Sequence, residues 1–189
     1  MISVREAASG LMAAYRLARL DAGGMALIEA TAQGCRRSFW AALYAAPFYV
    51  VLAALRLEDP GDDPLRAILI ETIGYALAWT AFPLAAWYII RARGYLDRYF
   101  GYIAAYNWAN VLQVAIYVPI QLIEAGGVLP DAVVTLLALG MSAAVLYYQY
   151  FIARTALSCA AGPAANLVFV DFMIGLILTG LLQSLHQRS

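Results

Sequence analysis

The sequence predicts an all-α integral membrane protein: a bundle of five transmembrane helices preceded by an amphipathic N-terminal helical segment. Composition is the first observation, because 64% of the 189 residues are hydrophobic and only 13% are charged. Soluble domains have roughly 45–50% apolar and about 25% charged residues. The second observation is a series of five apolar stretches, each close to the roughly 20 residues that cross a hydrocarbon core of about 30 Å. In lipid, backbone N–H and C=O groups need partners within the segment, so we expect these stretches to be helices.

Residues 1–34 form the amphipathic segment. Residues 4–20 have helical periodicity, and the expected apolar face consists of Val4, Ala7, Ala8, Leu11, Ala14, Tyr15 and Ala18. After the pair Gly23–Gly24, a second short helix is expected from Met25 to about Gln33. An amphipathic helix with arginine on its polar side is typical of the headgroup plane of a membrane. Packing beneath the bundle as a cytoplasmic lid is the other interpretation, and the two are compatible.

Residues 35–189 form the transmembrane bundle, with spans expected at about 38–57, 65–90, 99–124, 132–153 and 164–185. Phe39 and Trp40 follow two arginines at the start of the first span, as interfacial anchors do. The first three spans each contain a proline, which is expected to kink the helix: Pro47, Pro83 and Pro119. The loops are short, so consecutive spans are predicted to be antiparallel neighbours.

The arginines predict the orientation. All twelve basic residues are arginine, which is typical of a high-GC genome, and basic residues accumulate in short cytoplasmic loops. With the N-terminus inside, nine arginines lie on the inner side and three lie outside, namely Arg56, Arg66 and Arg188. We therefore expect a multi-pass protein of the bacterial inner membrane, with a cytoplasmic N-terminus and a periplasmic C-terminus. Cys35 and Cys159 then face a reducing compartment, where a structural disulfide is not expected.

The third span is the most polar one. Its polar residues recur on one helical face, with Asn107 adjacent to them: Tyr106, Asn110, Gln113, Tyr117 and Gln121. Such a face is expected to point inward, where amides and phenols form hydrogen bonds to other helices. It either joins the helices, at about 0.6 kcal/mol per hydrogen bond on average, or lines a polar pathway or a lipid-headgroup groove. The structural role is the favoured interpretation.

Two acidic residues lie within spans, where a carboxylate is costly and usually has a partner. Asp171 near the inner end of span five is expected to form an ion pair with Arg154 at the end of span four. Glu71 near the outer end of span two is expected to reach outward beside Arg66. His186 is expected to be a solvated residue of the outer tail.

Several classes of function are disfavoured. Twelve acidic residues balance the twelve basic ones, so the clustered positive field that nucleic acids require is missing. None of the usual motifs of hydrolases, metalloproteases or nucleotide-binding proteins is present. We expect no enzymatic activity, no catalytic residue, no cofactor and no bound metal.

The plan of a basic amphipathic segment, five spans and a short tail resembles the Yip1-type family of small membrane proteins. The residues that carry the resemblance are the entry RRSFWAALYAAPFYV and the polar third span YNWANVLQVAIYVPIQLI. The resemblance implies a five-helix membrane protein without a reaction of its own. Eukaryotic relatives are associated with membrane trafficking and membrane shaping.

These observations predict a non-enzymatic membrane protein that binds lipids of the bilayer, other membrane proteins or a second copy of itself. The alternative is a small transporter or channel-like subunit with a polar path along the third span. A lipid-modifying enzyme that depends on Asp171 or Glu71 is the third hypothesis, and the least favoured.

Overall fold

The computed structural model describes residues 2–54 and 64–186, and these residues form helices and connecting turns only. The predicted all-α class is therefore confirmed for this part of the chain. Arg56, Arg188 and most of the acidic loop that begins at Glu58 lie outside the described residues. The elements in order are α1 Val4–Ala18, η1 Ala22–Leu27, α2 Ala32–Ser38, α3 Ala41–Ala54, α4 Pro64–Ala92, η2 Leu96–Arg98, α5 Tyr99–Ala125, α6 Asp131–Leu157 and α7 Ala161–His186.

Four helical segments are long and apolar enough to cross a membrane, namely Ala32–Ala54, Leu65–Ala92, Asp131–Leu157 and Ala161–His186. The sequence predicts five. The remaining long helix, α5, has 27 residues, which include two asparagines and two glutamines, and it is not among these four. The first span also differs from one continuous helix, because α2 and α3 are separated at Phe39 and Trp40.

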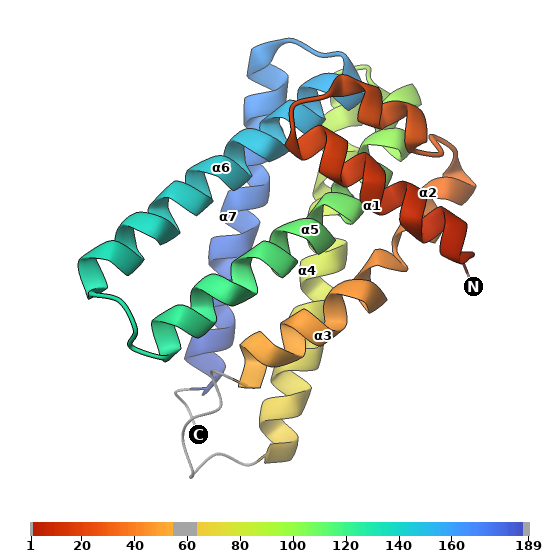
Figure 1. Ribbon diagram of the computed structural model, residues 1–189. Coiled ribbons are helices and arrows are strands. Elements are labelled where there is room, and N and C mark those ends of the chain that lie inside the picture. The colour runs from red at the N-terminus through yellow and green to blue at the C-terminus, as the bar shows by residue number, and fades with distance from the viewer. Residues whose placement is uncertain (1, 55–63, 187–189) are drawn as a thin grey trace.

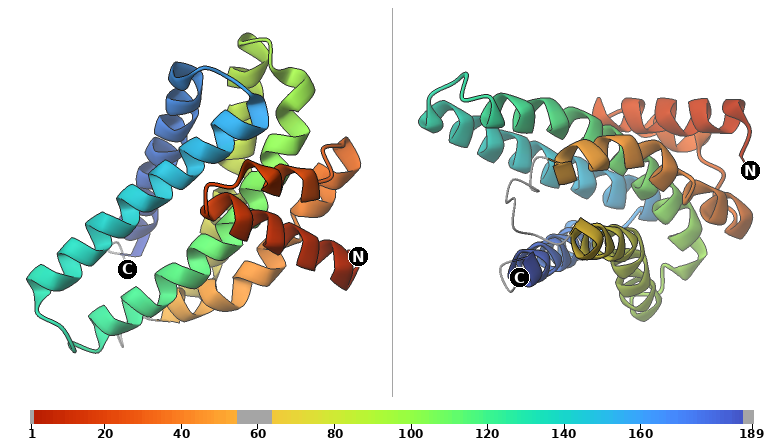
Figure 2. Two further views of the ribbon diagram at one scale, coloured as in Figure 1. Left: turned by 45° about the horizontal axis from the view of Figure 1, so that its top comes forward. Right: turned by 90° about the horizontal axis from the view of Figure 1, so that it is seen from below.

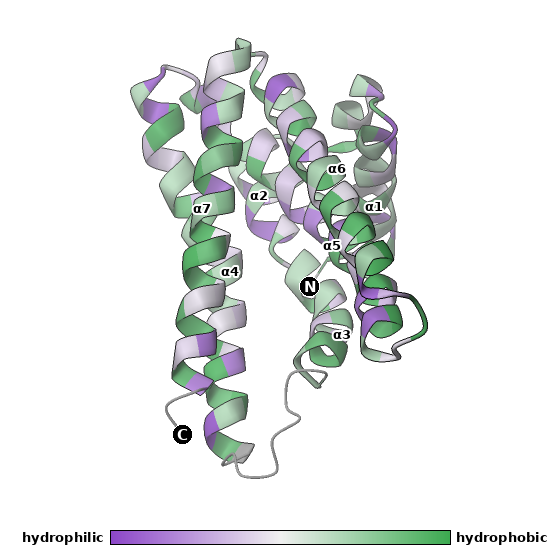
Figure 3. Cartoon of the chain, turned by 90° about the vertical axis from the view of Figure 1, so that its left-hand side faces the viewer, coloured by the Kyte–Doolittle hydropathy of each residue, from purple (hydrophilic) through white to green (hydrophobic). Residues whose placement is uncertain are grey.

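The helices form two layers that meet at one end (Figure 1). The helices α4 and α7 run side by side, and α3, α5 and α6 are inclined to them (Figures 1 and 2). The two layers diverge toward the C-terminal end of α3, as Figure 3 shows. The main partner of α3 is therefore α5, and that of α4 is α7. The predicted pairing of consecutive spans is realised for α5–α6 and α6–α7, whereas α3 and α4 pack mainly on helices distant in sequence.

Close approach explains the α4–α7 pair. Gly74 faces Leu182, and a Cβ atom at Gly74 would lie 2.7 Å from the Leu182 side chain. A larger residue at this position would require the Leu182 side chain to move. The neighbouring layer is organised around α5, whose residues 101–109 are all buried beneath α1, α2, α3 and α6.

The helix α1 begins as the N-terminal periodicity predicts. The Ser3 hydroxyl accepts a hydrogen bond from the Glu6 backbone N–H at 3.2 Å, and the Glu6 carboxylate accepts one from the Ser3 N–H at 2.7 Å. This reciprocal capping satisfies two backbone donors at the helix start. The second predicted helix is wrong in its bounds: a 3₁₀ turn covers Ala22–Leu27 and α2 begins at Ala32. The cause is Thr31, whose hydroxyl accepts from the Gly34 N–H at 3.0 Å and starts a new helix there.

The face of α1 that packs on the bundle differs from the predicted apolar face. Its buried residues are mostly small: Ala7, Gly10, Ala13, Ala14 and Leu17. Leu11 and Tyr15 are exposed instead. Small side chains let the α1 backbone approach Trp108 of α5 closely, because a Cβ atom at Gly10 would overlap the indole ring.

We predict that Gly10→Val displaces α1 from α5. Overpacking of this kind costs about 1–3 kcal/mol, because the buried indole has to move. Reversible unfolding in mixed detergent micelles measures the free energy, and limited proteolysis within residues 2–34 reports release of α1. The control is Ala8→Val, which adds the same side chain on the exposed side of α1. Equal stability of the two variants would contradict the close packing.

Candidate functional site: the polar face of α5

The N-terminal half of the polar face of α5, called its inner half below, joins three other elements. The Tyr106 hydroxyl donates a hydrogen bond to the Asp171 carboxylate of α7 at 2.7 Å. The Asn107 amide donates to the Ser38 hydroxyl of α2 at 2.9 Å, and Ser38 in turn donates to the Cys35 carbonyl at 2.7 Å.

The next residue of the stripe reaches the third of these elements, α6. The Asn110 side-chain oxygen accepts from the Gln149 amide of α6 at 3.2 Å. Each of the three polar residues Tyr106, Asn107 and Asn110 thus reaches a different neighbour of α5, as hydrogen-bonded contacts between helices do in apolar surroundings.

The C-terminal half of the stripe, called its outer half below, does not join helices in this way. The Gln121 amide donates to the Tyr117 hydroxyl at 2.8 Å and to the Glu124 carboxylate at 3.2 Å, so both contacts stay within α5. The Gln113 amide nitrogen is buried, and the described residues offer it no hydrogen-bond partner. The six predicted stripe residues therefore separate into an inner set that joins helices and an outer set that does not.

A cavity of about 260 Å³ lies beside the outer set, near the middle of α5, α6 and α7. Gln113 and Tyr117 line it from α5, Ser142 from α6 and Phe172 from α7, and most of the remaining wall is apolar. The Ser142 hydroxyl donates to the Ala138 carbonyl at 2.8 Å, so it is used within its own helix. The donor of Gln113 is thus left beside a largely apolar cavity.

Asp171 does not form the predicted ion pair with Arg154. Within residues 2–54 and 64–186, the structure contains no ion pair between them, and the hydrogen-bond donor to Asp171 is Tyr106. The reason is that the two residues lie at different heights along their antiparallel helices. Arg154 lies three residues before the end of α6, whereas Asp171 lies ten residues after the start of α7. Seven residues correspond to about 10 Å along antiparallel helices.

Glu71 is part of a polar cluster at the opposite end of the molecule. The prediction that it reaches outward beside Arg66 is wrong, because Glu71 is only 6% exposed. Its carboxylate accepts a hydrogen bond from the Tyr49 hydroxyl of α3 at 2.6 Å and lies 3.8 Å from His186 Nε2 of α7. Arg66 donates instead to the Leu185 carbonyl at 2.9 Å. His186 is therefore a half-buried neighbour of Glu71, which only the antiparallel packing of α4 and α7 brings about.

A second polar cluster holds the N-terminal segment against the bundle. Arg37 of α2 pairs with the carboxylate of Glu6 in α1, and its guanidinium lies 3.9 Å from the Glu29 carboxylate. The pKa of Glu6 is lowered below its ordinary value, foremost by the hydrogen bond from the Ser3 backbone N–H and also by Arg37. Several polar side chains line a cavity of about 170 Å³ beneath α1, together with Trp108: Glu6, Ser9, Glu29, Arg37 and Ser38. The Ser-x-x-Glu spacing of Ser3 and Glu6 is the sequence signal for the helix start, but it does not reveal Arg37.

The described residues contain no group of three His, Cys, Asp or Glu side chains placed to hold a metal. Cys35 and Cys159 are both buried and free. Comparison with known protein families, with curated proteins and with solved structures finds no match for this chain. The resemblance to the Yip1-type family therefore stays a prediction, and the function is inferred from residues and geometry.

We predict that Tyr106→Phe destabilises the fold by about 1–3 kcal/mol, because it leaves a carboxylate in apolar surroundings without its donor. The loss should shrink in an Asp171→Ala background, as expected for two residues that interact directly. Unfolding of the four proteins of this cycle in mixed detergent micelles measures the coupling. Tyr88→Phe, at an exposed tyrosine of α4, is the control and should change stability little. Additive single losses would show that the two residues act separately.

Proposed function

We propose that this chain is a non-enzymatic integral membrane protein that binds lipids or partner proteins at the inner face of a bacterial membrane, as the Yip1-type resemblance implies. The observation that carries the proposal is the position of α1. Its small residues are buried against the bundle, while the side chains on its opposite side are exposed and largely apolar: Val4, Ala8, Leu11, Met12 and Tyr15. Arg5 and Arg16 lie at one edge of this exposed surface, and Arg19 lies on the Tyr15 ring just after the end of α1.

The exposed surface of α1 is held in a fixed direction. The Ser9 hydroxyl donates to the Leu27 carbonyl at 3.1 Å, and the Tyr148 hydroxyl of α6 donates to the Ala14 carbonyl at 2.7 Å. With the Glu6–Arg37 pair, these contacts attach α1 to η1, α2 and α6. A helix attached in this way presents its exposed apolar side chains without a further ordering cost. Burial of such side chains at a lipid headgroup boundary or on a partner is favourable.

The proposed membrane arrangement has five spans, with the N-terminus inside. Four apolar helices and the arginine distribution support it. We include α5 as a span because its polar inner half is covered by other helices and needs no contact with lipid. Leucine and isoleucine side chains are exposed along α4, α6 and α7, as expected of lipid-facing helices.

Spin labels on α1 test the proposal. We introduce Leu11→Cys into a chain whose two native cysteines are replaced by alanine, and reconstitute the labelled protein into anionic vesicles. The label at Leu11 should collide more with oxygen than with a water-soluble nickel complex, because that side of α1 lies in lipid. Arg5→Cys, at the arginine edge, is the control and should show the opposite preference. Nickel access at Leu11 equal to that at Arg5 would overturn a lipid-facing α1, and labels immobilised without oxygen access would favour a protein partner.

The transporter alternative is favoured by one observation, the buried Gln113 amide beside the 260 Å³ cavity. A water-filled path would make Gln113→Cys react with a membrane-impermeant thiol reagent in the same cysteine-free background. The proposed lipid- or partner-binding protein predicts protection, since the described wall of the cavity is mostly apolar. The expected result is much slower labelling than at the exposed control Gln33→Cys. Comparable rates would favour the transporter.

A further inference from the structure

Two consecutive arginines at the end of α2 have different surroundings. Arg37 is paired with Glu6 and lies near Glu29, so its charge is compensated. Arg36 is exposed, and the described part of the chain gives it no ion pair or hydrogen bond. Because successive helical residues point about 100° apart, the side chain of Arg36 leaves the helix on a different face from that of Arg37. Its positive charge is available to an anion from outside the chain.

Arg36 lies at one end of a groove of about 410 Å³, a volume in the usual range of ligand sites. Phe39 and Trp40 line the groove next to Arg36, Leu43 and Ala46 continue along α3, and Tyr75 of α4 forms the opposite wall. The groove therefore has a cation and aromatic rings at one end and apolar side chains beyond them.

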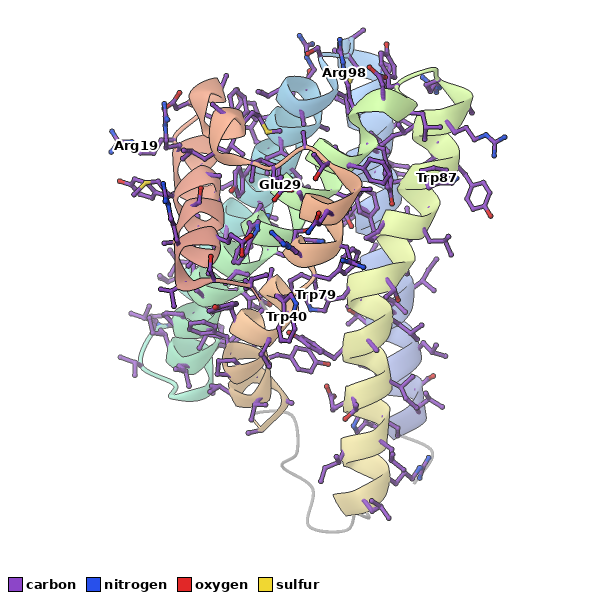
Figure 4. All side chains as sticks on the ribbon, turned by 90° about the vertical axis from the view of Figure 1, so that its right-hand side faces the viewer. Arg19, Glu29, Trp40, Trp79, Trp87 and Arg98 are labelled. Atoms are coloured by element: carbon purple, nitrogen blue, oxygen red, sulfur yellow. The ribbon has the colours of Figure 1, made fainter. Side chains whose placement is uncertain are left out.

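The contact between α3 and α4 keeps the groove walls in place. The Tyr75 hydroxyl donates a hydrogen bond to the Ala42 carbonyl, and the Tyr75 ring packs on Tyr49 with 4.5 Å between centroids. Figure 4 shows Trp40 and Trp79 in the same region, between the α2–α3 segment and α4. Trp79 is buried, whereas Trp40 is 39% exposed. A half-exposed tryptophan beside an arginine is the pattern of a membrane interface.

We propose that this groove binds one anionic phospholipid, with the phosphate on the Arg36 guanidinium and an acyl chain along Leu43, Ala46 and Tyr75. Charge complementarity identifies the headgroup, because the groove has one uncompensated cation and no acidic residue among its lining. The apolar continuation identifies an attached acyl chain, since a free anion would leave that part unfilled. Leu43 is 63% exposed, so the groove opens onto the apolar outer surface of α3, from which a lipid can enter.

The inference rests on the proposed function in one respect, that the chain resides in a membrane. It is independent of α1, because no residue of α1 lines the groove. The spin-label result at Leu11 and the lipid-binding result at Arg36 can therefore fail separately.

Native mass spectrometry of the full chain in detergent tests the site. Phosphatidylglycerol and phosphatidylcholine with identical acyl chains are titrated against the wild type and against Arg36→Gln. We expect the wild type to bind phosphatidylglycerol more tightly, and Arg36→Gln to weaken that binding about tenfold and abolish the preference, as expected for loss of a charged hydrogen bond. Arg36→Lys should retain the preference in part, because it keeps the charge.

Two controls separate the site from general electrostatics. Arg93→Gln removes an equally exposed arginine after α4 and should leave both lipids bound as in the wild type. Ala46→Phe fills the groove and should weaken both lipids, with size-exclusion chromatography confirming an intact fold. Unchanged lipid preference in Arg36→Gln would overturn the proposal. Complete displacement of the lipid by glycerol 3-phosphate would also overturn it, because binding would then not require the acyl chain.

Discussion

A buried amide or carboxylate without a hydrogen-bond partner costs about 1–3 kcal/mol or more, and this constraint shapes the arrangement around α5. Its inner half contains Tyr106, Asn107 and Asn110, and a helix in apolar surroundings cannot leave them uncovered. They are covered by α7, α2 and α6, which supply Asp171, Ser38 and Gln149 as partners. Three elements, α2, α6 and α7, are thus positioned by the polar side chains of one helix. This explains why α5, which carries these polar side chains, is the most buried of the described long helices.

The same covering determines where α1 lies. The inner half of α5 is surrounded only when α1 packs over Trp108, and this contact requires the small residues of α1 to face inward. The other large apolar side chains of α1, including Leu11, Met12 and Tyr15, are then exposed on the opposite side. A helix that both covers the core and presents an apolar surface combines the two interpretations that the sequence leaves open, a lid and an interfacial helix. The proposed function depends on this double role.

The packing of the two layers determines where the proposed lipid groove and the cavity beside Gln113 lie. The α4–α7 layer is joined to α3 through Tyr75 and the Tyr49–Glu71 contact. Between these contacts and the end of α2 lies the groove that we assign to a lipid headgroup and chain. On the other side of α5, the cavity beside Gln113 is the feature that the transporter alternative requires. The groove lies where α3 is incompletely covered, and the cavity lies where α5 is incompletely covered. Both follow from the packing that buries the inner half of α5.

The sequence alone determined the all-α class, the positions of the long helices and the start of α1, because these depend on apolar length, periodicity and local capping. It also identified the polar face of α5, since residues on one helical face recur at a regular spacing. The sequence did not determine which side chains contact one another between helices. The neighbours of Asp171 and Glu71 depend on axial offsets of several residues and on which helices pair, and short loops do not determine either. Only the tertiary structure placed Tyr106 at Asp171 and His186 at Glu71. Only it showed that small residues and Leu17, and not Leu11 or Tyr15, hold α1 to the bundle. The physical reason is that close packing and the need of each buried polar group for a partner are properties of the assembled chain.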